Sequence, residues 1–244
     1  MTYSSGKSTL GYYRAALAGG SFLAAVLFFG GITPGSAETA TIIPPPAKSA
    51  AATGLRTEKA IFAGGCFWGV QGVFQHVKGV QNAVSGYAGG QSSAAKYEIV
   101  SSGQTGHAES VEVTYDPKVV SYGKLLQVYF SVAHNPTELN RQGPDTGTQY
   151  RSTIFAESKA QKETAASYIK QLDEAKVFDA PIATTIEMSK TFYAAEPYHQ
   201  DYATLHPDSG YIATYDLPKL DNLKKLFPDL YRAEPKLVAN AAVD

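Results

Sequence analysis

From residue 58 onward, the chain alternates between short apolar runs and apolar stripes at helical spacing. Runs that alternate with polar residues or stop at glycine or proline are typical of strands, and the predicted strands are 59–63, 80–87, 109–115, 152–156 and 182–188. Stripes that recur every three or four residues predict helices over 67–78, 122–132, 159–172 and 220–227. The order β-α-β-β-α-β-α-β predicts an α+β sandwich, in which helices cover one or both faces of a mixed sheet.

Between these elements, residues 134–149 (HNPTELNRQGPDTGTQ) have little apolar content and predict a long loop. Loops of this length inside a compact domain usually carry function. Ser121 and Ser158 precede two of the helical stripes and are typical N-cap residues, and Gln161 would complete a capping box with Ser158.

The first 37 residues are typical of a secretory signal peptide. Residues 1–14 carry Lys7 and Arg14 but no acid, residues 15–31 form an uncharged apolar run, and residues 33–37 end in small side chains. Because the apolar run approaches the length that crosses a bilayer, an uncleaved membrane anchor is the alternative. Either interpretation predicts an exported protein, periplasmic or anchored to a membrane on its extracytoplasmic side.

The rest of the chain divides by composition. Residues 38–57 are rich in Ala, Thr, Ser and Pro, with three consecutive prolines at 44–46, and this composition predicts a flexible linker. The patterned residues predict one folded domain over 58–231, followed by a C-terminal tail over 232–244.

Composition and charge exclude several classes of protein. The 244 residues include 21 basic and 22 acidic side chains, and the net charge of −1 argues against nucleic acid as the main partner. With 18% charged and 44% hydrophobic residues, the chain is neither a coiled coil nor a charged disordered protein, and it is long enough to bury a core. Its single cysteine, Cys66, excludes an internal disulfide and a Cys-rich zinc site.

Cys66 follows Gly64 and Gly65 at the point where the strand 59–63 gives way to the first predicted helix. At the start of a helix, unpaired N–H groups and the helix dipole favour an anion, so this position predicts a lowered thiol pKa and a nucleophilic thiolate. A small buried hydrophobic residue is the alternative for a free cysteine. In an exported protein, however, a lone thiol is a liability unless it serves a reaction.

Phe67 and Trp68 directly follow the cysteine. Adjacent residues of a helix point in different directions, so both rings cannot face the same apolar stripe. At least one of them is expected to face the cysteine, where an aromatic wall would form an apolar pocket.

The sequence around the cysteine resembles the signature of the A-type peptide methionine sulfoxide reductases, Gly65-Cys66-Phe67-Trp68-Gly69. Further motifs of that family follow in the same order: residues 86–90 (GYAGG), 97–98 (YE), 103–109 (GQTGHAE), 140–143 (NRQG) with Asp145, 147–152 (GTQYRS) and 198–200 (YHQ). The resemblance covers residues 58–231 and implies a ferredoxin-like α+β sandwich with long active-site loops, which agrees with the predicted order of elements.

The resemblance implies that the protein reduces the S epimer of methionine sulfoxide, free or in proteins, and so repairs oxidised proteins. By the residue match, Cys66 would be the nucleophile that becomes a sulfenic acid, and Glu109 would protonate the sulfoxide oxygen. The other matched residues would bond that oxygen, complete the polar network or bind the substrate: Tyr97 and Tyr150, Asp145, and Phe67, Trp68 and His199.

The implied chemistry is physically consistent. A sulfoxide sulfur is a poor electrophile until its oxygen is protonated, so an acid and a thiolate must converge on one S=O group. A carboxyl group in an aromatic pocket loses hydration, which raises its pKa and keeps it protonated near neutral pH. Without the resemblance, Glu109 at the start of an alternating strand would be interpreted as a solvated surface acid.

One departure from the family pattern concerns recycling. Many members carry resolving cysteines near the C-terminus, but the corresponding residues 210–214 (GYIAT) contain none, and Ser101 and Ser102 stand where some members have one. The chain therefore resembles the single-cysteine subgroup. That implies no bound cofactor and no metal, and a sulfenic acid reduced by an external thiol such as thioredoxin, glutaredoxin or glutathione.

Two other kinds of function fit the same residues. An exported thiol peroxidase or thiol hydrolase would use Cys66, the hydrolase with His107 or His199 as its base. A non-catalytic domain that binds methionine-rich or sulfoxide peptides would use only the aromatic pocket.

Overall fold

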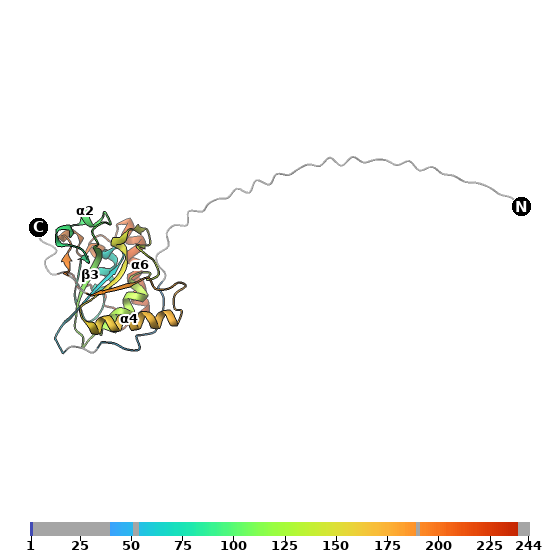
Figure 1. Cartoon of the computed structure of the whole chain (residues 1–244), viewed down its shortest axis with the longest axis horizontal. Coiled ribbons are helices and arrows are strands. Elements are labelled where there is room, and N and C mark those ends of the chain that lie inside the picture. The colour runs from blue at the N-terminus through green and yellow to red at the C-terminus, as the bar shows by residue number, and fades with distance from the viewer. Residues whose placement is uncertain (2–39, 51–53, 189–190, 239–244) are drawn as a thin grey trace, which may run out of the picture. The chain divides into compact units, whose positions relative to one another are not determined.

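The centre of the fold is a mixed β-sheet with the strand order β7-β6-β1-β3-β2-β8 (Figure 1). The computed structural model describes residues 1, 40–50, 54–188 and 191–238; the chain divides into two units, Met1–Thr33 and Pro34–Asp244, and the second contains the sheet. Neighbouring strands are antiparallel except for the parallel pair β6 and β7. The strands are β1 (Glu58–Gly64), β2 (Val80–Ala88), β3 (Ala108–Tyr115), β6 (Ser152–Ala156), β7 (Thr185–Met188) and β8 (Tyr193–Ala194).

The topology confirms the predicted α+β sandwich. Strands β1 and β3 pair at the centre, with β6 on the outer side of β1 and β2 on the outer side of β3. Together with one helix after β1 and one after β3, these four strands form the β-α-β-β-α-β unit of ferredoxin-like folds. A further helix then connects β6 to its parallel neighbour β7.

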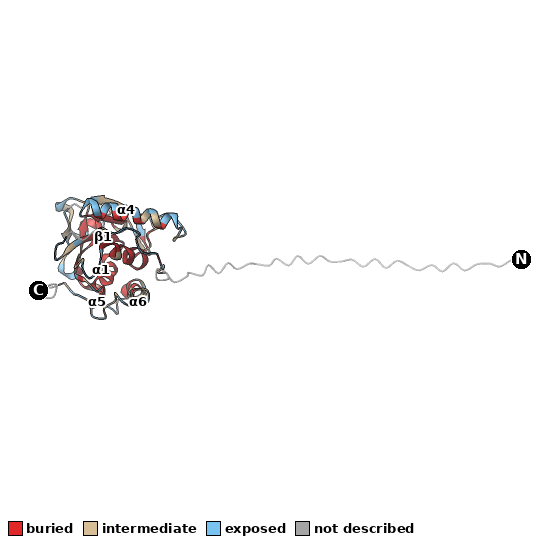
Figure 2. Cartoon of the chain, turned by 90° about the horizontal axis from the view of Figure 1, so that it is seen from below, coloured by how far each residue is buried: buried red, intermediate tan, exposed pale blue. Residues whose placement is uncertain are grey.

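The main helices share one face of the sheet. In β1, Ala60 and Phe62 belong to the large hydrophobic cluster that also contains the buried side chains of the helices, whereas Ile61 and Ala63 point to a small cluster on the opposite face. Figure 2 shows α4 buried along one edge and exposed along the other, as an amphipathic covering helix should be. These helices are α1 (Phe67–Gln75), α3 (Tyr122–Val128) with its π-helical continuation (Tyr129–Ala133), α4 (Lys159–Glu174) and α6 (Leu217–Leu226).

Two predicted helix starts are confirmed. The Ser121 hydroxyl accepts a hydrogen bond from Lys124 N (3.2 Å), and the Ser158 hydroxyl accepts one from Gln161 N (3.2 Å). The predicted capping box is displaced by one residue, because the Gln161 side chain accepts from Glu157 N rather than from Ser158 N.

The loop predicted over 134–149 carries more structure than its composition indicates. It contains a two-stranded hairpin of β4 (Arg141–Gln142) and β5 (Asp145–Thr146), and a 3-10 turn (Thr148–Tyr150) follows. Strand β7 begins three residues later than predicted, because Ala183 N donates to Pro136 O of this loop instead of joining the sheet.

The prediction of a flexible linker over 38–57 is wrong for residues 40–50. Ile43 is buried in the hydrophobic core, at 4% exposure. Its carbonyl accepts a hydrogen bond from the side chain of Gln127 on α3 (2.8 Å), and the Pro44 carbonyl accepts one from the Tyr168 hydroxyl on α4 (2.6 Å). Proline has no N–H to donate but keeps its carbonyl, so a proline-rich segment can be held by donors on neighbouring helices.

The domain also continues past residue 231, into the predicted tail. The Arg232 guanidinium donates to Val77 O (2.7 Å) and Val80 O (2.6 Å), and Lys236 N donates to Gln75 O (2.9 Å). Residues 232–238 therefore connect the C-terminal end of α1 to the start of β2 through hydrogen bonds.

The predicted signal peptide or anchor, apart from Met1, lies outside the described residues. Within the described residues, no helix has the length and apolar character that crossing a membrane requires.

Residues 42 and 43 provide a matched test of the docked N-terminal segment. Ile43→Ala removes a buried side chain and should lower the free energy of unfolding by about 2–4 kcal/mol in urea titrations. Ile42→Ala, at a neighbouring position that is 82% exposed, should change it by less than about 0.5 kcal/mol. A change below about 0.5 kcal/mol in Ile43→Ala as well would contradict a stabilising contact of the segment with the core.

Candidate active site

Cys66 occupies the N-cap of α1, at the end of a tight turn from β1. Gly65 has a φ of +85°, and a Cβ there would lie 2.5 Å from Cβ of Gln142, while a Cβ on Gly64 would lie 3.0 Å from the ring of His134. The two glycines therefore let the loop 134–149 pack directly against the turn. The cysteine itself is 9% exposed.

Glu109 lies on β3, directly behind the first turn of α1. Its carboxyl Oε2 accepts a hydrogen bond from Phe67 N (3.0 Å), and the residue is only 3% exposed. The pKa of Glu109 is raised to about 8: burial is the main cause, the hydrogen bond from Phe67 N opposes it, and the charges of Asp145 and Asp216 add to the rise. Glu109 is thus a buried acid that stays protonated near neutral pH, as the resemblance implies, and not a solvated surface carboxylate.

The predicted lowering of the Cys66 pKa is wrong. Burial raises the pKa of the thiol well above its ordinary value, and the charges of Glu109, Asp216 and Asp145 add to this shift, while the N–H of Trp68 opposes it. The start of α1 does stabilise an anion, through the N–H group of Trp68. The effect of this one group on the pKa is smaller than the combined effect of desolvation and the three nearby acids. Cys66 is therefore a thiol in the resting protein.

The aromatic residues after the cysteine divide as predicted. The Phe67 ring is buried in the core at 1% exposure, and the Trp68 ring is half-buried. Trp68 Nε1 donates to Nδ1 of His199 (3.2 Å), and the indole stacks on Tyr202 at 3.9 Å between ring centroids. The His199 ring also lies 5.1 Å from that of Phe67, so the three predicted substrate-binding residues form one aromatic group.

The remaining predicted residues approach from other elements. Tyr97 begins α2 (Tyr97–Val100), its ring 4.3 Å from that of His199. Tyr150 ends the 3-10 turn after the hairpin. Burial raises the pKa of both phenols, and so do the charges of Glu109 and Cys66, because both tyrosines lie close to those groups.

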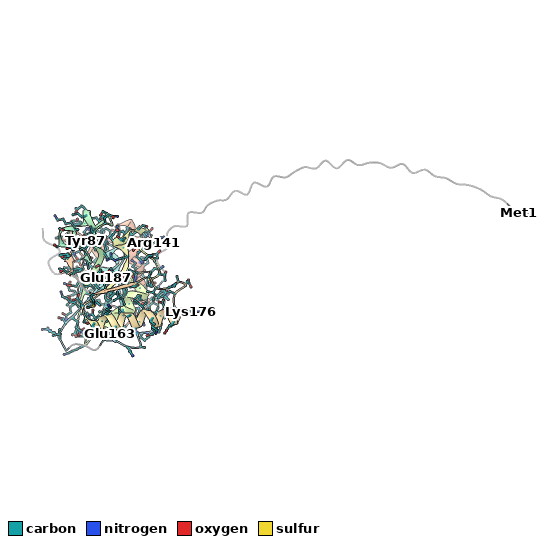
Figure 3. All side chains as sticks on the ribbon, viewed as in Figure 1. Met1, Tyr87, Arg141, Glu163, Lys176 and Glu187 are labelled. Carbon is teal, nitrogen blue, oxygen red and sulfur yellow. The ribbon has the colours of Figure 1, made fainter. Side chains whose placement is uncertain are left out.

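Asp145, on β5, accepts a short hydrogen bond from the hydroxyl of Tyr211. It is half-buried, and burial raises its pKa while that bond opposes the shift. The other seven predicted site residues thus gather around Cys66. In Figure 3, Tyr87, whose ring centroid lies 5.9 Å from that of Phe67, is at the end of the domain opposite to Glu163 of α4.

Sequence reasoning missed several residues next to the cysteine. A small cavity of about 20 Å³ adjoins it, lined by Cys66, Gln142, Gly143, Pro144, Asp145, Tyr211, Tyr215 and Lys219. Glu196 links two further tyrosines, since its carboxylate accepts from the Tyr87 hydroxyl (2.9 Å) and from Tyr97 N (3.0 Å). Residues 211–219 carry four polar side chains that a functional site could use: Tyr211, Tyr215, Asp216 and Lys219. No local sequence pattern connects them to Cys66, so the sequence alone does not place them at the site.

Neither histidine considered as a base for a thiol hydrolase is hydrogen-bonded to the sulfur. Nδ1 of His107 accepts from Gly90 N (3.2 Å), and its Nε2 lies 3.0 Å from Gln91 O. Nδ1 of His199 accepts from Trp68. The geometry therefore gives no support to a cysteine–histidine pair.

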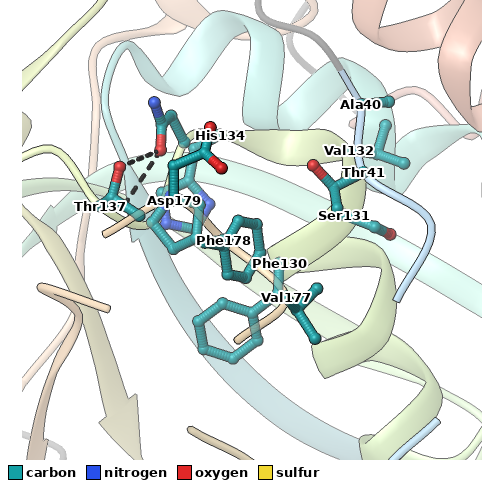
Figure 4. A pocket seen from close by; sticks show the side chains of 12 residues that line it. Ala40, Thr41, Phe130, Ser131, Val132, His134, Thr137, Val177, Phe178 and Asp179 are labelled. Atoms are coloured by element: carbon teal, nitrogen blue, oxygen red, sulfur yellow. Dashed lines mark hydrogen bonds between the residues drawn. The ribbon is translucent and has the colours of Figure 1, made fainter. Parts of the chain in front are cut away.

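A larger cavity, about 470 Å³, lies elsewhere, between the docked N-terminal segment and the residues after α3 and α4 (Figure 4). None of the predicted site residues lines it. The volume of a cavity therefore does not identify the reactive site in this protein. The site is identified by the thiol, carboxyl and phenol groups that lie together at the smaller cavity. Among the described residues, no group of three or more His, Cys, Asp and Glu side chains is placed to hold a metal ion.

The raised pKa of Glu109 predicts a specific dependence of stability on pH. In the unfolded chain this carboxyl ionises near its ordinary value of 4.5, and in the folded protein near 8. Between these values the folded state holds the extra proton, so the stability due to Glu109 falls as the pH rises. Relative to the parent, Glu109→Gln should therefore gain unfolding free energy between pH 5 and about pH 8 in urea titrations. A difference that does not change with pH would contradict a buried, protonated Glu109.

The comparisons with known proteins agree with this geometry. The family model "Peptide methionine sulfoxide reductase" matches residues 58–230. Peptide methionine sulfoxide reductase MsrA 2 of Mesorhizobium japonicum is 69% identical over 186 residues, which cover 76% of this chain and 95% of the relative. The crystal structure of reduced Mxr1 from Saccharomyces cerevisiae is 37% identical, with a TM-score of 0.57 over 64% of this chain and 88% of that one. Methionine sulfoxide reductase A of Corynebacterium diphtheriae is 33% identical, with a TM-score of 0.53 over 71% and 87%. The chain belongs to the peptide methionine sulfoxide reductase family.

Proposed function

We propose that this protein reduces the S epimer of methionine sulfoxide, free and in proteins, with Cys66 as the nucleophile and Glu109 as the acid. The observation that carries the proposal is the buried Glu109 carboxyl, with a pKa of about 8, bonded to the N–H of the residue that follows Cys66. A neutral carboxyl beside a thiol supplies the proton and the electron pair that a sulfoxide needs.

The first half of the reaction balances with these two groups alone. Two electrons pass from the Cys66 sulfur to the methionine sulfur, and the sulfoxide oxygen becomes the hydroxyl of a Cys66 sulfenic acid. Glu109 protonates that oxygen and recovers a proton from the thiol, so it ends the step protonated. The raised pKa of Cys66 fits this scheme, because the thiol proton is consumed within the site.

The aromatic group would select the substrate. Trp68 is fixed by its bond to His199 and its stack on Tyr202, so its indole face is a rigid apolar wall beside the thiol. Such a wall fits the methyl group of methionine sulfoxide. The phenols of Tyr97 and Tyr150, which lie near both Glu109 and Cys66, would donate hydrogen bonds to the oxygen. A pocket with a methyl wall on one side and oxygen donors on another accepts only one handedness at sulfur, and the family resemblance assigns that handedness to the S epimer.

The second half of the reaction requires a reductant from outside. The sequence contains one cysteine, so the sulfenic acid cannot condense with a second thiol of the chain. An external thiol would form a mixed disulfide with Cys66 and a second thiol would release it; thioredoxin, glutaredoxin and glutathione can each do this. The basic and apolar pattern of residues 1–37 supports an exported enzyme, periplasmic or membrane-anchored, that repairs oxidised proteins there.

A single-turnover experiment tests the proposal directly. Mixed with the separated epimers in the absence of reductant, the enzyme should release one methionine per chain from the S epimer and none from the R epimer, and then stop. Dimedone should then label Cys66, but only after the S epimer has been added, as mass spectrometry would detect. Cys66→Ser should give no methionine while keeping the parent circular dichroism spectrum. Two methionines per chain, release from the R epimer, or turnover by Cys66→Ser would each contradict the mechanism.

A further inference from the structure

A buried ion pair lies beside the nucleophile and has no part in the chemistry derived above. Asp216 is the last residue of the π-helical turn Ile212–Asp216, and Lys219 lies one turn further, on α6. Their side chains are 1% and 8% exposed, and Lys219 Nζ lies 3.5 Å from Asp216 Oδ1. Neither carboxylate oxygen has a hydrogen-bond partner among the described residues. Burying an ion pair costs desolvation energy, which suggests that the pair serves the site.

The ion pair of Asp216 and Lys219 packs against the first turn of α1. Gly69 is the third residue of that helix, and a Cβ there would lie 2.1 Å from Asp216 Oδ1 and 3.1 Å from Lys219 Nζ. Only glycine therefore allows the carboxylate to approach the backbone at this point. The Lys219 side chain lines the small cavity at Cys66, and Asp216 is not part of that lining.

This placement matters because the N-terminus of a helix stabilises only a limited amount of negative charge. A carboxylate already set against the first turn of α1 repels a thiolate at the N-cap and interacts with the same helix dipole. The titratable and charged groups that face Cys66 or Asp216 from the surrounding elements are Glu109, Asp145, Tyr97, Tyr150, Tyr211, Tyr215 and Lys219.

We propose that Asp216, held in place by Lys219, keeps Cys66 protonated in the resting enzyme and thereby makes it react with sulfoxides in preference to peroxides. The inference rests on the proposed function, since it concerns the same thiol. Among the charged groups that raise the pKa of Cys66, Asp216 ranks directly after Glu109.

The two oxidants differ in what they require of the thiol. Hydrogen peroxide oxidises a thiolate to a sulfenic acid and leaves as hydroxide, so the rate of this oxidation follows the thiolate fraction. A sulfoxide bound beside Glu109 accepts a proton during the reaction, and the thiol supplies that proton in return. Protonation of Cys66 therefore slows its oxidation by hydrogen peroxide but does not slow its reaction with methionine sulfoxide. The distinction is important in a chain whose single cysteine has no partner to rescue it from further oxidation.

Asp216→Asn tests the inference, because asparagine keeps the shape against Gly69 and removes the charge. The rate of alkylation by iodoacetamide, followed against pH, reports the pKa of Cys66, which should fall by about one unit in the variant. One unit is about a tenfold rise in the thiolate fraction at neutral pH. The rate constant for oxidation by hydrogen peroxide, relative to that for methionine sulfoxide in a single turnover, should rise by about tenfold.

Asp221→Asn is the matched control, since it makes the same change of charge on an exposed part of α6, and it should stay within twofold of the parent. If Asp216→Asn does not fold, Asp216→Ser, which also removes the negative charge but leaves a smaller side chain against Gly69, should shift both measurements in the same direction. An unchanged alkylation profile and an unchanged ratio in a folded variant would overturn the inference. Failure of the parent enzyme to release methionine would instead overturn the proposed function, so the two failures are distinct.

Discussion

The hydrogen bond from the Phe67 N–H to the buried carboxyl of Glu109 is the interaction on which the rest of the site depends. It joins β3 to the first turn of α1, and so fixes an acid beside the thiol at the N-cap. The same burial that removes water from Glu109 raises its pKa to about 8, so one structural fact provides both the position and the protonation state of the acid.

The electrostatics of the site follow from how many acids share this small volume. Glu109, Asp145 and Asp216 all raise the pKa of Cys66, and Lys219 forms an ion pair with Asp216. The resting site therefore stores its protons on Glu109 and Cys66. A sulfoxide, whose oxygen accepts a proton during reduction, can take it from Glu109 and Cys66. An ordinary reactive thiolate has no such proton to give, and in this respect the site differs from one.

Much of the fold could be predicted from the sequence, because period-two and helical patterns report burial one segment at a time. The strands of the central unit and the helices α1, α3 and α4 were found in this way. The docked segment 40–50 was missed because its prolines contribute carbonyl acceptors, and the donors, Gln127 and Tyr168, lie far along the chain. Composition alone cannot detect such a partnership.

The site shows the same limit. The position of Cys66 at a helix start could be predicted locally, but its pKa could not, because the opposing acids arrive from residues 109, 145 and 216. The role of Glu109 as an acid was predicted only from the family resemblance. The alternating pattern of the strand does not show that its first residues are buried by other parts of the fold. Asp216 and Tyr211 were missed, because their approach to Cys66 depends on how the segment after α5 (Tyr202–Leu205) folds back over α1.

The central claim is that Glu109 is a neutral carboxylic acid beside Cys66 at neutral pH, and infrared difference spectroscopy of the parent against Glu109→Gln measures this most directly. At pH 7 the parent should show the carbonyl stretch of a protonated carboxylic acid that the variant lacks, and this band should disappear with a midpoint near pH 8. Absence of the band at pH 7, or a midpoint near the ordinary value of 4.5, would contradict the account.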